Sequence, residues 1–187
     1  MERLQRSEVT GLLWLVARVW LGWEFLKAGW EKVTEPERAM WIGNQSGEGV
    51  RQLLGFSLQI APGGAMAQPD HPEVLGWYAT LIRHLFLPHA EVMARLVTFG
   101  ELLVGLALML GLFTRFAAAM GLLMNLSYML AGVSSLSPLM MLVEVSIVLT
   151  GTMAGYYGVD HYLMPMLQAR VVHLPRPNWI TPRVVPT

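Results

Sequence analysis

The chain of 187 residues is rich in apolar side chains and poor in charged ones. Apolar residues make up 54% of the sequence, charged residues make up 14%, and the formal net charge is zero. A chain without a basic excess lacks the electrostatic signature of a nucleic-acid-binding protein. Because there is no cysteine, disulfides, thiolate redox chemistry and cysteine-ligated iron–sulfur clusters are excluded. The apolar residues occur in long blocks, which indicates one membrane domain.

The first apolar block covers residues 9–29 and follows a short N-terminal segment that contains two arginines. It is long enough for one membrane-crossing helix, although Arg18 and Glu24 interrupt it. The two charges, and the lack of a small-residue cleavage site after the block, favour an uncleaved first span over a signal peptide. We expect residues 1–8 to form a cytoplasmic N-terminus.

Residues 30–90 are mixed in character and predict a long loop outside the cytoplasm. Its second half contains one amphipathic piece, residues 74–88, which carries a polar edge opposite apolar side chains and stops at Pro88. With about 14 residues it is too short to cross a bilayer. We therefore expect a short helix that lies at the membrane surface.

Three further apolar blocks, at residues 91–113, 116–133 and 138–157, predict the remaining spans, with a tight turn at Thr114 and Arg115 between the first two. Small and polar residues recur at helical spacing along the third span, which predicts a face packed against other helices: Thr114, Ala118, Gly121, Asn125, Tyr128 and Gly132. The fold class is therefore all-α, an integral membrane four-helix bundle with an extracytoplasmic loop and a short interfacial helix between helices 1 and 2.

Arginines predict the orientation of this bundle. The segments that lie on the same side as the N-terminus hold six of them, and the short turn between the last two spans has no charge. Because basic residues are enriched on the cytoplasmic side, both termini should be cytoplasmic. The membrane domain then covers residues 9–165, and residues 166–187 form a proline-rich cytoplasmic tail.

Charged residues in the first two spans are arranged in the same way. Arg18 and Glu24 are six positions apart, and so are Arg95 and Glu101. In antiparallel neighbours, Arg18 would face Glu101 where Glu24 faces Arg95, because both pairs of residue numbers add up to 119. Charges at bilayer depth cost a few kcal/mol or more unless they are paired. The pairs serve either as structural links between two helices or as a functional site, and the sequence leaves both readings open.

Three motifs mark a family. The pattern R-x3-G-x2-F-x3-G-x2-K starts at Arg18, E-x3-G-x5-G-L-x-T-R starts at Glu101, and a G-x-D pattern ends at Asp160. With these motifs in this order over about residues 15–165, the sequence resembles the DoxX/DoxD family of small four-helix membrane proteins of bacteria and archaea. Its long loop and its length make it more similar to the DoxD side of that family.

The resemblance implies a location in the cell (inner) membrane of a bacterium or archaeon. The best-described family member is the large membrane subunit of a thiosulfate:quinone oxidoreductase, which oxidises thiosulfate to tetrathionate, passes electrons to quinone and works with a small DoxA subunit. No DoxA-like segment follows in this sequence, so such a partner is expected as a separate chain. The expected partners are the lipid bilayer and either other subunits or further copies of this chain, and no nucleic acid.

Quinone is the cofactor that these intramembrane charges suit best. A quinone site needs an apolar slot, groups that hydrogen-bond the carbonyls, and groups that deliver protons. Buried carboxyls are candidates for proton delivery, and buried arginines are candidates for polarising a carbonyl. The candidate catalytic residues are Glu101, Arg18, Glu24, Arg95 and Glu144.

Two polar residues of the third span are candidates for binding the cofactor. Asn125 and Tyr128 can add hydrogen bonds to a quinone, or they only join helices. Glu144, in the fourth span, has no cation in the predicted pairing. It either joins the level of Glu24 and Arg95 or is protonated.

Haem and metals are not expected. A membrane haem usually takes two histidines from spanning helices, and all five histidines lie outside the predicted spans. Flavin is not expected either. The loop residues His71, His84 and His89 are the remaining candidates for a metal site, and three loop histidines are more often solvated.

The sequence therefore predicts the membrane subunit of a quinone-linked oxidoreductase, of the thiosulfate:quinone type if the resemblance extends to activity. One alternative is a non-catalytic integral subunit that anchors or stabilises a larger respiratory or redox complex. Another is a small-solute or ion carrier, since paired intramembrane charges also line transport paths.

Overall fold

The structure of the protein is a computed structural model that describes residues 2–68, 70, 73–133, 136–150, 154–155, 157–163 and 166, with side chains from residue 10 onward. Over these residues it is helical and contains no strand, which confirms the all-α expectation. The predicted tail, apart from residue 166, and the histidines His71 and His173 lie outside the described residues.

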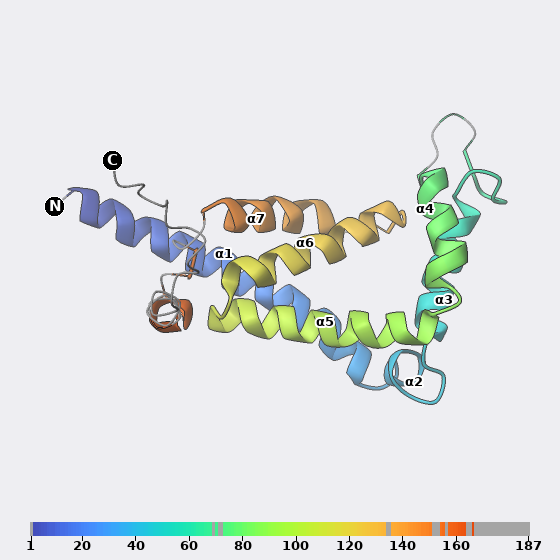
Figure 1. Cartoon of the computed structure of the whole chain (residues 1–187), viewed down its shortest axis with the longest axis horizontal. Coiled ribbons are helices and arrows are strands. Elements are labelled where there is room, and N and C mark those ends of the chain that lie inside the picture. The colour runs from blue at the N-terminus through green and yellow to red at the C-terminus, as the bar shows by residue number, and fades with distance from the viewer. Residues whose placement is uncertain are drawn as a thin grey trace, which may run out of the picture.

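Four long helices run side by side along the longest axis of the molecule (Figure 1). Each of the four apolar blocks forms one of them, and they are α1 (Glu2–Val33), α5 (Ala90–Leu110), α6 (Thr114–Leu130) and α7 (Ser137–Thr150). Helix α1 packs on α5, α5 on α6, α6 on α7, and α7 on α1, so the four close into a ring.

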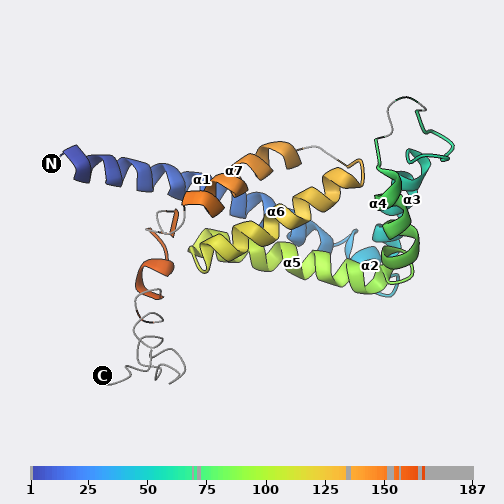
Figure 2. The same ribbon diagram turned by 45° about the horizontal axis from the view of Figure 1, so that its top comes forward.

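The segment between α1 and α5 is a folded cap. It contains α2 (Arg38–Trp41), α3 (Glu48–Gln59), α4 (Gly76–Leu81) and the π-helix η1 (Ile82–Phe86). Figures 1 and 2 show α3 and α4 running across one end of the long helices. The sequence predicted mostly loop here. The segment folds because its apolar side chains form a core of their own, which includes Trp41, Leu54, Val74, Tyr78 and Ile82.

The predicted amphipathic piece is the pair α4 and η1. It begins later than expected, at Gly76, and changes to π-helix at Ile82 before α5 begins at Ala90. The Tyr78 hydroxyl donates a hydrogen bond of 2.9 Å to the carbonyl oxygen of Ser127 in α6. This contact fixes the cap to the end of the bundle.

Glycines set the register between α1 and α5. A Cβ atom on Gly22 would lie 2.8 Å from the carbonyl oxygen of Gly105, and one on Gly29 would lie 2.9 Å from the backbone nitrogen of Leu102. Residue numbers that face each other therefore add up to 127 at Gly22 and 131 at Gly29, not to the 119 that the charge pattern predicted. Close backbone contact between small residues decides how these helices pack.

The turn between α5 and α6 also differs from the expectation. It covers residues 111–113, a few positions earlier than predicted, and α6 already begins at Thr114. Gly111 and Phe113 have positive φ angles of 67° and 46°, so the chain reverses through two left-handed residues. The stripe predicted along α6 is confirmed, because Thr114, Ala118 and Asn125 are all buried.

Candidate functional site

Glu101 lies at the centre of a small polar network inside the helical ring. Only 2% of the residue is exposed. Its Oε1 accepts a hydrogen bond of 2.6 Å from the Tyr128 hydroxyl, and its Oε2 accepts one of 2.7 Å from Lys32 Nζ. Lys32 is in the last turn of α1 and also donates to the Ala28 carbonyl oxygen at 3.2 Å. Three helices therefore meet at one buried carboxylate, which is neutralised by one cation.

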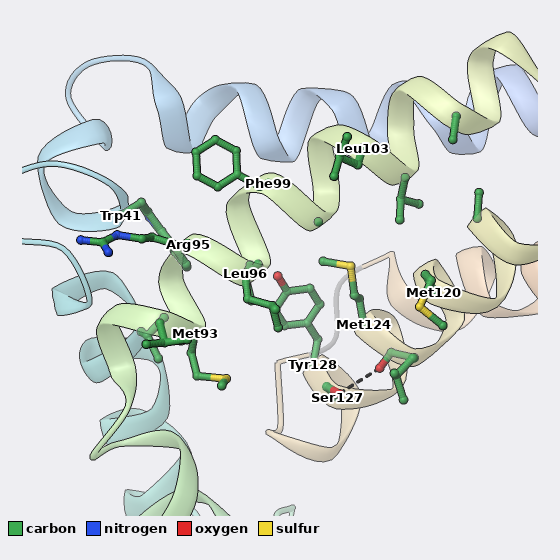
Figure 3. Close-up of a pocket in the computed structure, with 18 of the residues that line it drawn as sticks. Trp41, Met93, Arg95, Leu96, Phe99, Leu103, Met120, Met124, Ser127 and Tyr128 are labelled. Atoms are coloured by element: carbon green, nitrogen blue, oxygen red, sulfur yellow. Dashed lines mark hydrogen bonds between the residues drawn. The ribbon is translucent and has the colours of Figure 1, made fainter. Parts of the chain in front are cut away.

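An apolar groove leads to this network from the outer face of α5 and α6. Its volume is about 940 Å³, and its lining is apolar apart from a few residues that include Arg95, Ser127 and Tyr128. Figure 3 shows Met124 and Tyr128 of α6 pointing across the groove toward α5, which contributes Leu96 and Leu103. The cap closes one end of the groove with Trp41 and other side chains.

A second, smaller hollow lies on the other side of Tyr128, and we call it the polar pocket. Its volume is about 270 Å³. The polar lining residues come from all four long helices and are Glu24, Lys32, Glu101, Asn125, Tyr128 and Ser137. Tyr128 and the cap residue Trp41 line both the groove and the pocket. The Lys32 ammonium also lies 4.9 Å from the centre of the Trp41 ring, a cation–π distance.

The predicted pair of Arg18 with Glu101 is wrong. Arg18 is 1% exposed, but its guanidinium donates to the carbonyl oxygens of Ala154 at 3.2 Å and Tyr157 at 2.9 Å. The glycine contacts between α1 and α5 place Arg18 beside Gly111, where any Cβ atom would overlap the guanidinium. The same register brings the end of α1 to Glu101, so Lys32 takes the position that was predicted for Arg18.

The predicted pair of Glu24 with Arg95 is also wrong. Arg95 is exposed on the outside of α5 and pairs with Glu91, one turn earlier on the same helix. Figure 3 shows its side chain pointing away from Tyr128. Glu24 is half-buried, lines the polar pocket and has no ion-pair partner among the described residues. The shifted register separates the two residues.

Asn125 and Glu144 are brought together in the bundle. Glu144 is fully buried, and its Oε1 accepts a hydrogen bond of 2.8 Å from Asn125 Nδ2. Its second oxygen has no partner in the described part of the chain. The first of the two alternatives for Glu144, a place beside Glu24 and Arg95, is excluded because Arg95 lies outside the ring. The protonated carboxyl is the alternative that remains.

Asp160 was not predicted as a site residue, yet it holds the other end of the bundle together. Its two carboxylate oxygens each accept a backbone N–H bond of 2.7 Å, from Phe113 and from Thr114. The backbone N–H of Asp160 donates to the Gly111 carbonyl oxygen at 2.8 Å. We call Arg18, Gly111, Asp160 and these partners the clasp. The G-x-D motif was the signal for it, and its role is to join the segment after α7 to the α5–α6 turn.

The histidines that the structure describes give no sign of a shared site. His84 and His89 are both exposed, and His89 Nδ1 lies 2.9 Å from the carbonyl oxygen of Leu85. Within the described residues, no three His, Cys, Asp or Glu side chains are grouped so as to hold a metal ion.

The fold and the site define a class of protein. In the described part of the chain, α5 is long and apolar enough to cross a membrane, and α7 is a shorter apolar helix. Buried charged residues inside a ring of apolar helices are typical of a membrane protein. The profile of the DoxX family matches residues 13–135, more than half of the chain, and the protein belongs to this membrane protein family. No curated protein and no solved structure matches the chain.

Proposed function

We propose that this protein is the membrane subunit of a quinone-linked oxidoreductase, with the quinone ring bound beside Tyr128 and its tail in the apolar groove. The observation that carries the proposal is the apolar groove of about 940 Å³ that ends at a buried polar network. A bound quinone supplies an acceptor for two electrons and two protons. Membership of a family with possible redox roles supports this reading.

The polar network has hydrogen bonds to spare for a quinone. An ammonium group has three donors, and Lys32 uses one on Glu101 and one on Ala28. The third can bind a carbonyl oxygen. The Tyr128 hydroxyl donates to Glu101, so its oxygen can accept a hydrogen bond from a hydroxyl of the reduced quinol. Tyr128 lines the groove and would lie against the ring, whereas Lys32 and Glu101 line the pocket and would reach only the edge of the ring beside Tyr128, where protons are exchanged. The groove residues exclude water.

The bundle itself is proposed to span the membrane with all four long helices. Large apolar side chains point outward from each of them, as shown by the exposed fractions of Leu13 (66%), Leu103 (67%), Leu123 (57%) and Leu149 (78%). In water such a surface would be unfavourable, whereas in a bilayer it contacts lipid tails. Helix α5, at about 31 Å, matches the hydrocarbon thickness.

The electron donor is proposed to react on a separate subunit. The resemblance to the DoxD side implies thiosulfate, which is an anion. The charged residues that line the polar pocket are Glu24, Glu101 and Lys32, and they leave an excess of negative charge. Because like charges repel, this pocket does not suit an anionic donor.

Quinone binding by the purified full chain tests the proposal. In lipid nanodiscs, decylubiquinone or a short-chain menaquinone should quench tryptophan fluorescence saturably, since Trp41 lines the groove. Tyr128→Phe should raise the Kd of the reduced quinol about fivefold, which corresponds to the loss of one neutral hydrogen bond. Glu101→Gln should raise Kd about tenfold or more, because Lys32 and Tyr128 lose the charged acceptor that orients them. Glu91→Gln removes the same charge from the outer face of α5 and should leave Kd unchanged.

Two results would contradict the proposal. The first is the absence of saturable quenching by either quinone, which is what the anchoring subunit and the solute carrier predict. The second is an unchanged Kd in well-folded Tyr128→Phe and Glu101→Gln variants, which would place the quinone elsewhere.

A further inference from the structure

The polar pocket lies toward the cap end of the bundle. Its lining includes Lys32 from the end of α1, Trp41 from the cap, and Val133, Leu136 and Ser137 from the two sides of the α6–α7 connection. All of these residues lie at the end of the long helices that the cap covers (Figure 1). A polar hollow of about 270 Å³ has room for several water molecules.

Polar groups inside the pocket can hold such water. The side chains of Glu24 and Ser137 line it, and neither side chain has a hydrogen-bond or ion-pair partner among the described residues. Lys32 and Tyr128 bind Glu101, and Glu24 lies further from the cap, at the inner end of the pocket. A half-buried carboxylate without a partner in the protein is normally hydrated, because desolvation without a hydrogen bond is costly. The pocket therefore joins the surface at the cap end to the buried carboxylate.

Tyr128 separates this pocket from the apolar groove. It lines both, and its hydroxyl bonds Glu101, which lines only the pocket. Asn125 forms another part of the pocket wall and binds Glu144 behind it. Glu144 does not line the pocket. The Asn125 side chain that lies between Glu144 and the pocket is an amide, which does not titrate. The titratable groups that face the pocket are thus Glu24, Lys32, Glu101 and Tyr128.

We propose that the polar pocket is a water-filled vestibule through which protons pass from the cap side of the membrane to Glu101 and Tyr128, with Glu24 at its inner end. This inference rests on the proposed function. Reduction of one quinone by two electrons from a reduced sulfur donor takes up two protons, and Glu101 and Tyr128 receive both from the cap side. The excess of negative charge in the vestibule admits small cations and repels anions.

The absence of cysteine makes the vestibule directly testable. Ser137→Cys would be the single thiol of the full chain, and it lines the pocket while only 8% exposed. Ser146→Cys is the matched control, because Ser146 is on the same helix and is half-buried but does not line the pocket. The probes are membrane-impermeant methanethiosulfonates, one cationic and one anionic, added to sealed liposomes that contain the full-length variants. Only an ionised, hydrated thiol reacts quickly with them.

We expect Ser137→Cys to react with the cationic probe at least about tenfold faster than Ser146→Cys, because the control thiol lies outside the hydrated pocket. The anionic probe should react roughly tenfold more slowly than the cationic one, and Glu24→Gln should reduce this preference. The labelled fraction should match that of Asn44→Cys in the cap, which would place the opening on the cap side.

A rate for Ser137→Cys no higher than that for Ser146→Cys would overturn the vestibule, and so would equal rates with both probes. Quinone binding is measured separately by fluorescence quenching, so the two ideas fail independently. Slow labelling with normal quinone binding overturns the vestibule alone. Fast labelling without quinone binding overturns the proposed function, and with it the delivery of protons to a quinone.

Discussion

At the scale of single residues, Asp160 makes bonds that no neutral side chain can replace in full. Its carboxylate accepts two backbone N–H bonds at the first turn of α6 and acts electrostatically on the buried Arg18. A negative charge at the start of a helix is stabilising, and a buried arginine without a nearby carboxylate is costly.

Asp160→Asn should therefore lower the free energy of unfolding by about 2 kcal/mol, which combines one charged hydrogen bond and the interaction with Arg18. The measurement is denaturant unfolding of the full chain in mild detergent. Glu91→Gln is the control, because its exposed pair with Arg95 should contribute less than about 0.5 kcal/mol. Equal losses in the two variants would mean that the clasp contributes little stability.

The residues of the candidate site were predicted only in part. Glu101 and Tyr128 were both named from the sequence, and the structure joins them. Lys32 ends the first family motif but was not among the candidate catalytic or cofactor-binding residues, because it lies beyond the end of the predicted first span. A lysine stem can reach back over apolar surface while its ammonium binds a distant partner, so a cation need not lie at the level of the carboxylate it neutralises. Spacing along one helix carries no information about this reach.

At the scale of helices, the backbone contact at Gly105 determines how closely α1 and α5 can pack. A Cβ atom on Gly105 would lie 2.6 Å from the backbone nitrogen of Leu26, which cannot move without moving α1. Gly55, in the cap helix α3, has nothing within 4 Å of the same position. Gly55 is therefore a matched control for replacing Gly105 by alanine.

Gly105→Ala should destabilise the protein by about 1 to 3 kcal/mol, because the two helices must separate. Gly55→Ala should be neutral or stabilise it by up to about 1 kcal/mol, since alanine is the better helix former and meets no obstacle. Thermal unfolding of both variants in the same detergent checks the signs. A stable Gly105→Ala variant would argue against glycine-determined packing of α1 on α5.

Helix positions were easier to predict than helix register. Each apolar block became a helix because a long apolar run has few other stable conformations, and the stripe on α6 has the helical period. The register failed because the equal spacing of Arg18 and Glu24 and of Arg95 and Glu101 fitted one alignment by charge alone. Close packing at Gly22, Gly29 and Gly105 fits another and decides the outcome. The cap was missed because its apolar residues are scattered and converge only in three dimensions.

At the scale of the whole molecule, the cap and the clasp lie at opposite ends of the four long helices (Figure 2). If the bundle spans the membrane, single thiols at these two ends must be on opposite sides of it. Asn44 in the cap and Tyr162 beyond the clasp are both exposed.

Asn44→Cys and Tyr162→Cys should therefore be labelled from opposite sides by an impermeant maleimide in sealed right-side-out vesicles. The arginine distribution predicts that the cap end faces outward, so only Asn44→Cys should react before the vesicles are opened. Labelling of both thiols in sealed vesicles would contradict a bundle that crosses the membrane with the ends on different sides.

The clasp also has a consequence for biosynthesis. Arg18 enters the membrane early in translation, but its carbonyl acceptors at Ala154 and Tyr157, together with Asp160, leave the ribosome about 140 residues later. At roughly 5 to 20 residues per second, the guanidinium of Arg18 is without these partners for several seconds or longer. The last helix therefore completes the structure, and a nascent chain that stalls before Asp160 presents an exposed cationic defect to which membrane quality-control proteases can respond.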